Sequence, residues 1–140
     1  MAEPPWRRSC EAHATPTWLE SLPGWLREGL AAVPGWPEAD AATLDLLLSE
    51  VATNVVEHGT TDGLARVRLD LVVDTSRVTV VLDDDGPPAH VDVAGAQMPG
   101  TEAEGGRGLA LVAALAEDFR WEQTSTGNRW TFTYERSSQP

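Results

Sequence analysis

One long amphipathic helix is predicted from Pro37 to Glu57. Its first turn contains Glu38 and Asp40, which favour the positive end of the helix dipole, and Gly59 follows as a stop signal. Apolar residues recur along it at helical spacing, and they are Leu44, Leu47, Leu48, Val51 and Val55. Such a stripe indicates a helix that packs one face against the core of a globular fold.

Two pairs of alternating segments lie downstream and predict two β-hairpins. In the first hairpin, residues 65–73 turn back as residues 78–82. In the second, residues 119–123 turn back as residues 129–135, with three aromatic residues on one face, Trp130, Phe132 and Tyr134. Helices combined with antiparallel hairpins predict an α+β fold built as a two-layer α/β sandwich.

Shorter elements are predicted around this framework. Thr15 and Pro16 favour a helix start, and apolar spacing continues to Leu30, but Pro23-Gly24 predicts a kink or two short pieces. An edge strand is possible over residues 6–12, and a short helix is expected over residues 109–117. The 140 residues suffice for one domain, so we expect a single domain over 1–140 with a core of about 15–135.

The charge of the chain excludes several classes of function. Acidic residues outnumber lysine and arginine 22 to 10, and the formal net charge is −12. Lysine is absent, so a P-loop nucleotide site is excluded because that site needs a lysine on the phosphates. Nucleic-acid affinity depends on basic contacts to phosphate, so no direct nucleic-acid partner is expected. A partner protein with a basic patch suits this charge better.

The cellular location is predicted from cysteine usage and hydropathy. Cys10 is the one cysteine and cannot form an internal disulfide, which is typical of a reducing compartment. No apolar run approaches the ~20 residues of a membrane span, and the N-terminus lacks a signal-peptide core. We therefore expect a cytoplasmic protein without membrane contact.

Two polar residues lie at the edge of the apolar stripe of the long helix. Glu50 and Asn54 are one helical turn apart and face the same way. A partly desolvated carboxylate at such an edge can act as a general base. The amide oxygen of Asn54 is a hard ligand suited to Mg²⁺, which takes most other ligands from water and substrate phosphates. Taken alone, such a pair more often forms a solvated helix edge.

Two further segments complete a possible nucleotide site. Asp84 follows the predicted strand 78–82, and its carboxylate could accept a hydrogen bond from an exocyclic amine, while Gly86 would let a flat ring approach the backbone. A glycine-rich segment, residues 105–108, precedes a predicted helix start, which is an arrangement suited to anions. Each segment alone is weakly specific, but their order along the chain is informative.

Together these motifs resemble the three nucleotide-binding boxes of the GHKL (Bergerat-fold) ATPases. The chain is similar in particular to the anti-sigma-factor serine/threonine kinases of bacterial partner switches. The resemblance implies a mixed, mostly antiparallel sheet backed by helices, with ATP or ADP and Mg²⁺ as ligands. It implies Glu50 as general base, Asn54 on Mg²⁺ and Asp84 on the adenine amine. The other nucleotide-binding residues it implies are Gly86, Pro88, Gly105, Gly106, Arg107, Gly108 and Leu109, with residues 98–108 forming a lid over the phosphates.

The same resemblance predicts what the protein does. It implies phosphorylation of a STAS-type anti-sigma-factor antagonist and sequestration of a sigma factor, and it suggests a homodimer. The alternative is a regulatory binding module that keeps the nucleotide pocket but transfers no phosphate. One departure from the family concerns the last hairpin, where Gly127-Asn128 replaces the frequent Gly-Thr. We expect this difference to alter a polar contact near the phosphates.

Overall fold

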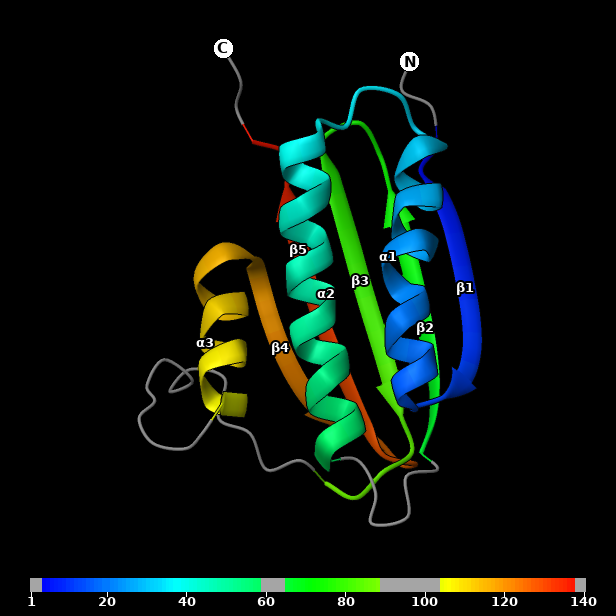
Figure 1. Ribbon diagram of the computed structural model, residues 1–140, viewed down its shortest axis with the longest axis vertical. Helices are drawn as coiled ribbons and strands as arrows, with labels where there is room; N and C mark the ends of the chain where they lie inside the picture. The colour runs from blue at the N-terminus through cyan, green and yellow to red at the C-terminus, as the bar shows by residue number, and fades with distance from the viewer. Residues whose placement is uncertain (1–3, 59–64, 89–103, 138–140) are drawn as a thin grey trace.

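A computed structural model describes residues 4–58, 65–88 and 104–137, apart from the side chains of His58 and residues 104–107. Within these ranges, three helices cover one face of a five-stranded sheet (Figure 1). The helices are α1 (Pro16–Ala31), α2 (Glu38–His58) and α3 (Glu104–Leu115). The strands are β1 (Trp6–His13), β2 (Arg66–Val73), β3 (Arg77–Asp84), β4 (Glu117–Gln123) and β5 (Asn128–Glu135). The predicted α+β two-layer sandwich is confirmed.

The sheet has the strand order β1-β2-β3-β5-β4, and all four pairings are antiparallel. The mixed sheet that the resemblance implied is therefore wholly antiparallel in the described residues. The last strand, β5, lies between β3 and β4. In the register of β3 with β5, Asp84 at the end of β3 lies opposite Asn128 at the start of β5. This register joins two parts of the chain that are far apart in sequence.

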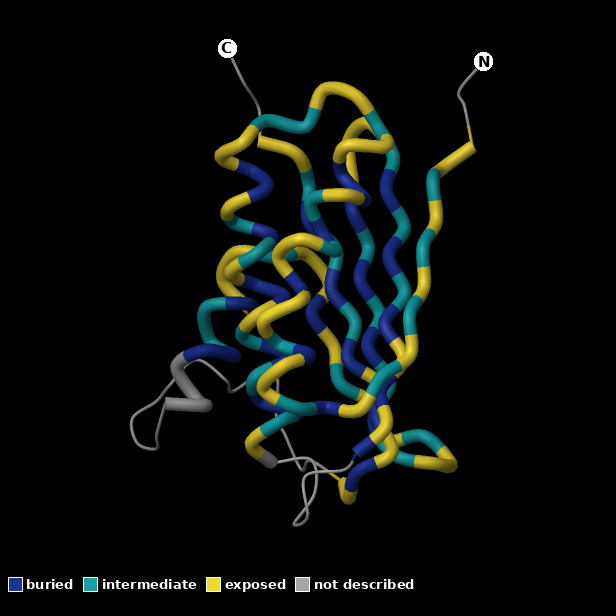
Figure 2. Tube along the Cα trace, turned by 45° about the vertical axis from the view of Figure 1, so that its right-hand side comes forward, coloured by how far each residue is buried: buried dark blue, intermediate teal, exposed yellow. Residues whose placement is uncertain are grey.

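Alternation along the strands separates a buried face from an outer face, as Figure 2 shows for the central strands. On β3 the buried positions are Val78, Val80, Leu82 and Asp84. The predicted stripe on α2 is fully buried against this face, as are the three aromatic side chains on β5. The core is thus formed where the periodicities of helix and strand predicted it.

Two helix predictions need correction. Helix α1 is a single continuous helix through Pro23, not two short pieces. Pro23 is on the solvent side, where its missing N–H costs one backbone hydrogen bond, while Leu22 and Leu26 anchor the helix to the core on either side. Helix α3 begins at Glu104 rather than Leu109, so the glycine-rich residues 105–108 form its first turns.

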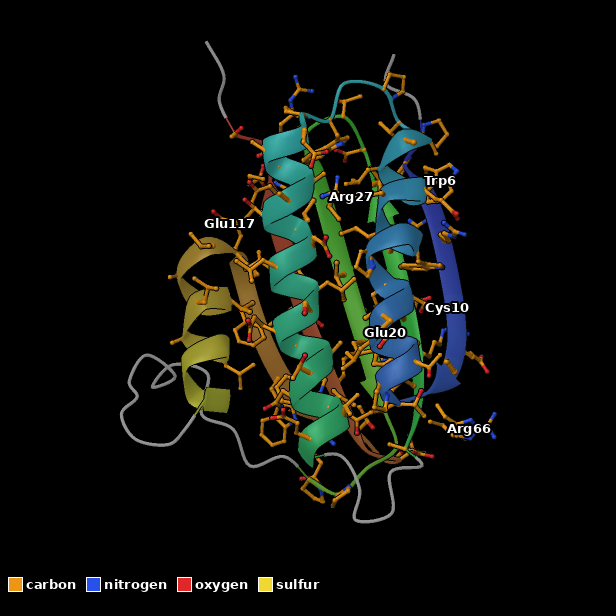
Figure 3. All side chains as sticks on the ribbon, viewed as in Figure 1. Trp6, Cys10, Glu20, Arg27, Arg66 and Glu117 are labelled. Carbon is orange, nitrogen blue, oxygen red and sulfur yellow. The ribbon has the colours of Figure 1, made fainter. Side chains whose placement is uncertain are left out.

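One end of the sandwich, at the top of Figure 1, is closed by side-chain contacts. Tyr134 donates a hydrogen bond of 2.6 Å to Asp40 at the start of α2, and the Trp36 indole donates one of 2.8 Å to the carbonyl of Asp74. Arg27 lies between α1 and α2 (Figure 3) and pairs with Glu38 at 2.6 Å. These contacts fix the helical layer on the sheet. No helix within the described residues has the length and apolar character needed to cross a membrane.

Candidate functional site

The predicted site residues gather at the other end of the sandwich, at the bottom of Figure 1. The C-terminal end of α2, the end of β3 and the start of α3 all lie there, together with the turn that joins β4 to β5. Helix α2 packs against both β3 and α3. The three sequence segments that were predicted to converge are therefore brought to the same end of the fold.

The three consecutive aspartates after Leu82 have different surroundings. Asp83 is on the outer face of the sheet, where Arg129 pairs with it at 2.7 Å. Asp85 is exposed and accepts a hydrogen bond of 2.7 Å from the backbone N–H of Arg66. Asp84, only 5% exposed, has its carboxylate on the buried face. The period of the strand thus places one of the three carboxylates beneath the helical layer.

Three N–H groups donate to the carboxylate of Asp84. Its Oδ1 accepts from the backbone of Gly86 at 2.8 Å and from Nδ2 of Asn128 at 2.9 Å. Its Oδ2 accepts from the indole Nε1 of Trp130 at 3.0 Å. Hydrogen bonds to a charged group are stronger than those between neutral groups, so these contacts fix both the position and the rotation of the carboxylate.

Asn128 connects Asp84 to two further elements. Its second Nδ2 hydrogen bond goes to the carbonyl of Pro87 at 2.9 Å, and its Oδ1 accepts from the indole of Trp121 at 2.9 Å. Two acceptors thus face Nδ2 and one donor faces Oδ1, which determines the orientation of the amide. The predicted effect of Asn128 near the phosphates stays a prediction; in the described residues, hydrogen bonds join Asn128 to Asp84, Pro87 and Trp121. Sequence reasoning missed this role, as well as those of Trp121 and Trp130.

Gly127 allows the β4–β5 turn to approach the end of β3. A Cβ atom at this position would overlap the carbonyl oxygen of Asp84 and lie 2.7 Å from Cα of Asp85. The turn itself is closed by Thr124, whose backbone N–H donates to the Gly127 carbonyl at 2.8 Å. A residue without a side chain is therefore needed here for Asn128 to reach Asp84.

A second group of site residues lies on α2 and α3. Glu50 is half-buried and Asn54 is 8% exposed, one helical turn further along α2. Helix α3 approaches them closely at Gly108, where a Cβ atom would overlap Oε1 of Glu50 and lie 3.0 Å from its Cδ. The structure thus brings Glu50 and the glycine-rich segment into direct contact.

The remaining predicted residues occupy different environments. Gly86 and Leu109 are buried, while Pro88 is exposed. Gly105, Gly106 and Arg107 are in the first turns of α3. The part of the predicted lid over residues 98–103 lies outside the described residues.

Two cavities lie away from these residues, around the connection between α1 and α2. Their volumes are about 330 and 790 Å³, and Val33 and Pro34 contribute to both. Their walls contain none of Glu50, Asn54 and Asp84. These two cavities therefore do not mark the candidate site, which is identified by the chemistry of its side chains.

Comparisons with known proteins agree with this geometry. A family model described as the histidine kinase-like ATPase domain matches residues 12–134, which is most of the chain and contains every site residue named above. A search of curated proteins found no match.

Proposed function

This chain belongs to the histidine kinase-like ATPase domain family, and we propose that it is an ATP-dependent serine/threonine protein kinase of the anti-sigma-factor type. Domains of this family bind ATP or ADP, generally with Mg²⁺. The observation that carries the finer proposal is the placement of Glu50, a half-buried carboxylate on α2 in contact with Gly108 of α3. A site that only binds nucleotide has no need of a base at this position.

The donors present suit a magnesium nucleotide. Asp84 supplies a fixed acceptor for the adenine amine, and Gly86 beside it presents no side chain to the ring. Asn54, one turn beyond Glu50, supplies an amide oxygen, and Mg²⁺ commonly takes only one or two protein ligands in addition to phosphates and waters. Adenine recognition and phosphate chemistry are thus assigned to different elements, β3 for the former and α2 with α3 for the latter.

The proposed reaction transfers the γ-phosphoryl group of ATP to a serine or threonine hydroxyl. Glu50 accepts the proton of that hydroxyl. The hydroxyl oxygen bonds to the γ-phosphorus, the bond from this phosphorus to the β–γ bridging oxygen breaks, and ADP leaves. Such transfer depends chiefly on positioning and electrostatic stabilisation. The packing of Gly108 on Glu50 supports this role, because it limits the positions that the carboxylate can take.

We propose a STAS-type anti-sigma-factor antagonist as the phosphate acceptor and a sigma factor as the protein that is sequestered. The excess of acids, 22 against 10 lysines and arginines, favours a partner with a basic surface. A second function is a nucleotide-dependent binding module without phosphoryl transfer. Asn128, which stands where the family frequently has threonine, leaves room for this second function.

Two measurements test the proposal in sequence. Calorimetry with ADP and Mg²⁺ should give one site, and bound nucleotide should raise the melting temperature by mass action. Incubation with ATP and a STAS-type protein encoded beside this chain should then add one phosphoryl mass to that protein. No binding at millimolar nucleotide would refute the nucleotide site, whereas binding without transfer would favour the binding module.

A further inference from the structure

The hydrogen bonds of Asp84 leave a defined acceptor position. A carboxylate offers about four acceptor sites, two on each oxygen. Gly86 and Asn128 use both sites on Oδ1, and Trp130 uses one on Oδ2. Within the described residues one site remains, and it belongs to Oδ2, the oxygen to which the Trp130 indole donates.

We propose that Trp130 and Asn128 are positioning residues that determine nucleobase specificity through Asp84. They orient the carboxylate so that its remaining acceptor site can receive one N–H group, which is the chemistry of an exocyclic amine. This inference rests on the proposed nucleotide site and deepens it, because it assigns base selection to three residues on two strands instead of one aspartate.

Trp130 is suited to this role because its ring is buried and packed against Trp121. Its side chain is 2% exposed on the core face of β5, and its ring centroid lies 6.5 Å from that of Trp121. Asn128, also 2% exposed, is held on both sides of its amide. Donors that are themselves held by packing limit the orientations that the carboxylate can take.

Asn128 also connects the base-recognition residues to the turn after β3. Its Nδ2 group donates to Asp84 and to the carbonyl of Pro87, so it holds the carboxylate and the 86–88 backbone at a set separation. A hydroxyl at this position has one hydrogen to donate and could make only one of these two bonds. The asparagine therefore fixes the acceptor and the adjacent backbone together.

The test compares ADP with the diphosphate of purine riboside, which is ADP without its exocyclic amine. Both dissociation constants are measured calorimetrically with Mg²⁺. The constant for the purine riboside diphosphate divided by that for ADP is the preference for ADP, and this ratio reports on recognition of the amine alone. A hydrogen bond to a charged acceptor predicts a preference for ADP of about tenfold or more in the unmodified protein. In Trp130→Phe the ratio should fall by about threefold or more, because Oδ2 loses the donor that orients it.

Trp36→Phe is the matched control, because its indole N–H also donates one hydrogen bond but at the opposite end of the sandwich. It should leave the ratio unchanged. A general loss of stability lowers the affinity for both nucleotides through the folded fraction, and it does not change their ratio.

A second pair of variants covers the case in which Trp130→Phe does not fold. Asn128→Ala removes the donor to Asp84 and should lower the ratio, whereas Asn128→Thr restores one hydroxyl donor and should recover part of it. Failure of the unmodified protein to bind ADP would overturn the nucleotide site and this inference together. An unmodified protein that prefers ADP, with variants whose ratio is unchanged or higher, would overturn only the positioning roles of Trp130 and Asn128.

Discussion

Asp40 and Asp84 are the buried aspartates of the described residues, 2% and 5% exposed, and they lie at opposite ends of the sandwich. Asp40 accepts from the Tyr134 hydroxyl at 2.6 Å and from the Ser137 hydroxyl at 3.1 Å. Its donors come from the C-terminal part of the chain, and the contact attaches that part to α2. By burial and number of hydrogen bonds alone, the two carboxylates are hard to distinguish.

The surroundings of the two carboxylates differ. Within the described residues, Asp84 lies beside the buried Gly86, and Gly127 packs closely against it. Glu50 and Asn54 on α2 belong to the same end of the molecule. Asp40 is at a helix start and its donors are hydroxyl and backbone groups. A buried, hydrogen-bonded aspartate is therefore insufficient to indicate a binding site. The glycines packed around Asp84, and a second set of reactive groups at the same end of the fold, supply the distinction.

The largest difference between substitutions at the two ends of the sandwich is expected in the rate of phosphoryl transfer. Glu50→Gln keeps the shape of the side chain but removes the base, so the transfer rate should fall by ~10²–10⁴. ADP affinity should stay within a few-fold, since ground-state binding depends little on this carboxylate. The control is Glu38→Gln, the same change at the exposed far end of α2, which should leave the rate unaltered. Full transfer by Glu50→Gln would mean that another group accepts the proton.

Adding a methyl group at Gly108 should give the second-largest effect on the rate of phosphoryl transfer. Gly108→Ala places a Cβ atom on Oε1 of Glu50 and displaces the carboxylate, and a displacement of about 1 Å can lower a rate by about 10²-fold. The control is Gly24→Ala in α1, where no atom lies within 4 Å of the added methyl group apart from the adjacent residues and the helix's own backbone. That change should raise the free energy of unfolding by up to about 1 kcal/mol and leave transfer intact. Equal rates of phosphoryl transfer for both variants would show that the contact between α2 and α3 has no role in transfer.

Nucleotide binding should separate the two aspartates directly. Asp84→Ala and Asp40→Ala each leave buried donors without partners, so each should lower the free energy of unfolding by about 1–3 kcal/mol. Only Asp84→Ala should also weaken ADP binding, by more than about tenfold. Calorimetry and chemical denaturation on both variants measure the two effects. Asp83→Ala, on the outer face of the sheet, should bind ADP normally.

Local patterns in the sequence predicted most of the fold. The apolar stripe of α2 and the alternation of β2, β3 and β5 depend on contacts between near neighbours and on one buried face, and both match the structure. The start of α3 did not follow from local propensity, because glycines favour a loop over residues 105–108. The close packing of Gly108 on Glu50 suggests why the helix extends through them, since tertiary contacts can override propensity.

The candidate site was predictable only in part. Glu50, Asn54 and Asp84 belong to recognisable patterns, but the partners of Asp84 depend on which strands are neighbours. Insertion of β5 between β3 and β4 places Asn128 opposite Asp84, and no local pattern specifies that pairing. Trp130 was correctly expected on the aromatic core face, yet a position on that face does not reveal where its indole N–H points.

The smallest expected effect is a pH dependence confined to the Asp40 end. Burial, together with the hydrogen bond to Asp40, raises the pKa of Tyr134 to about 12. The pKa of an unfolded tyrosine is about 10, so the folded chain retains this proton where the unfolded chain releases it. The resulting stability is fully present below about pH 10 and is lost as the pH rises towards about 12. Chemical denaturation at successive pH values should show this decline, and Tyr134→Phe should remove the part that belongs to Tyr134. Burial also raises the pKa of the Cys10 thiol, so Cys10 contributes a separate alkaline decline that this variant leaves in place.

Tyr134 is the one tyrosine of the chain, so the phenolate absorbance of the folded protein reports on this residue alone. The absorbance should rise well above pH 10 in the unmodified protein and move towards the ordinary tyrosine range in Asp40→Ala, because the acceptor of the hydroxyl proton is lost. ADP affinity should not follow this titration while the protein stays folded, since Asp84 and its donors lie at the other end of the sheet. A nucleotide affinity that changes in step with the phenolate signal would show that the two ends are coupled, and the division between a structural carboxylate and a ligand-binding one would no longer hold.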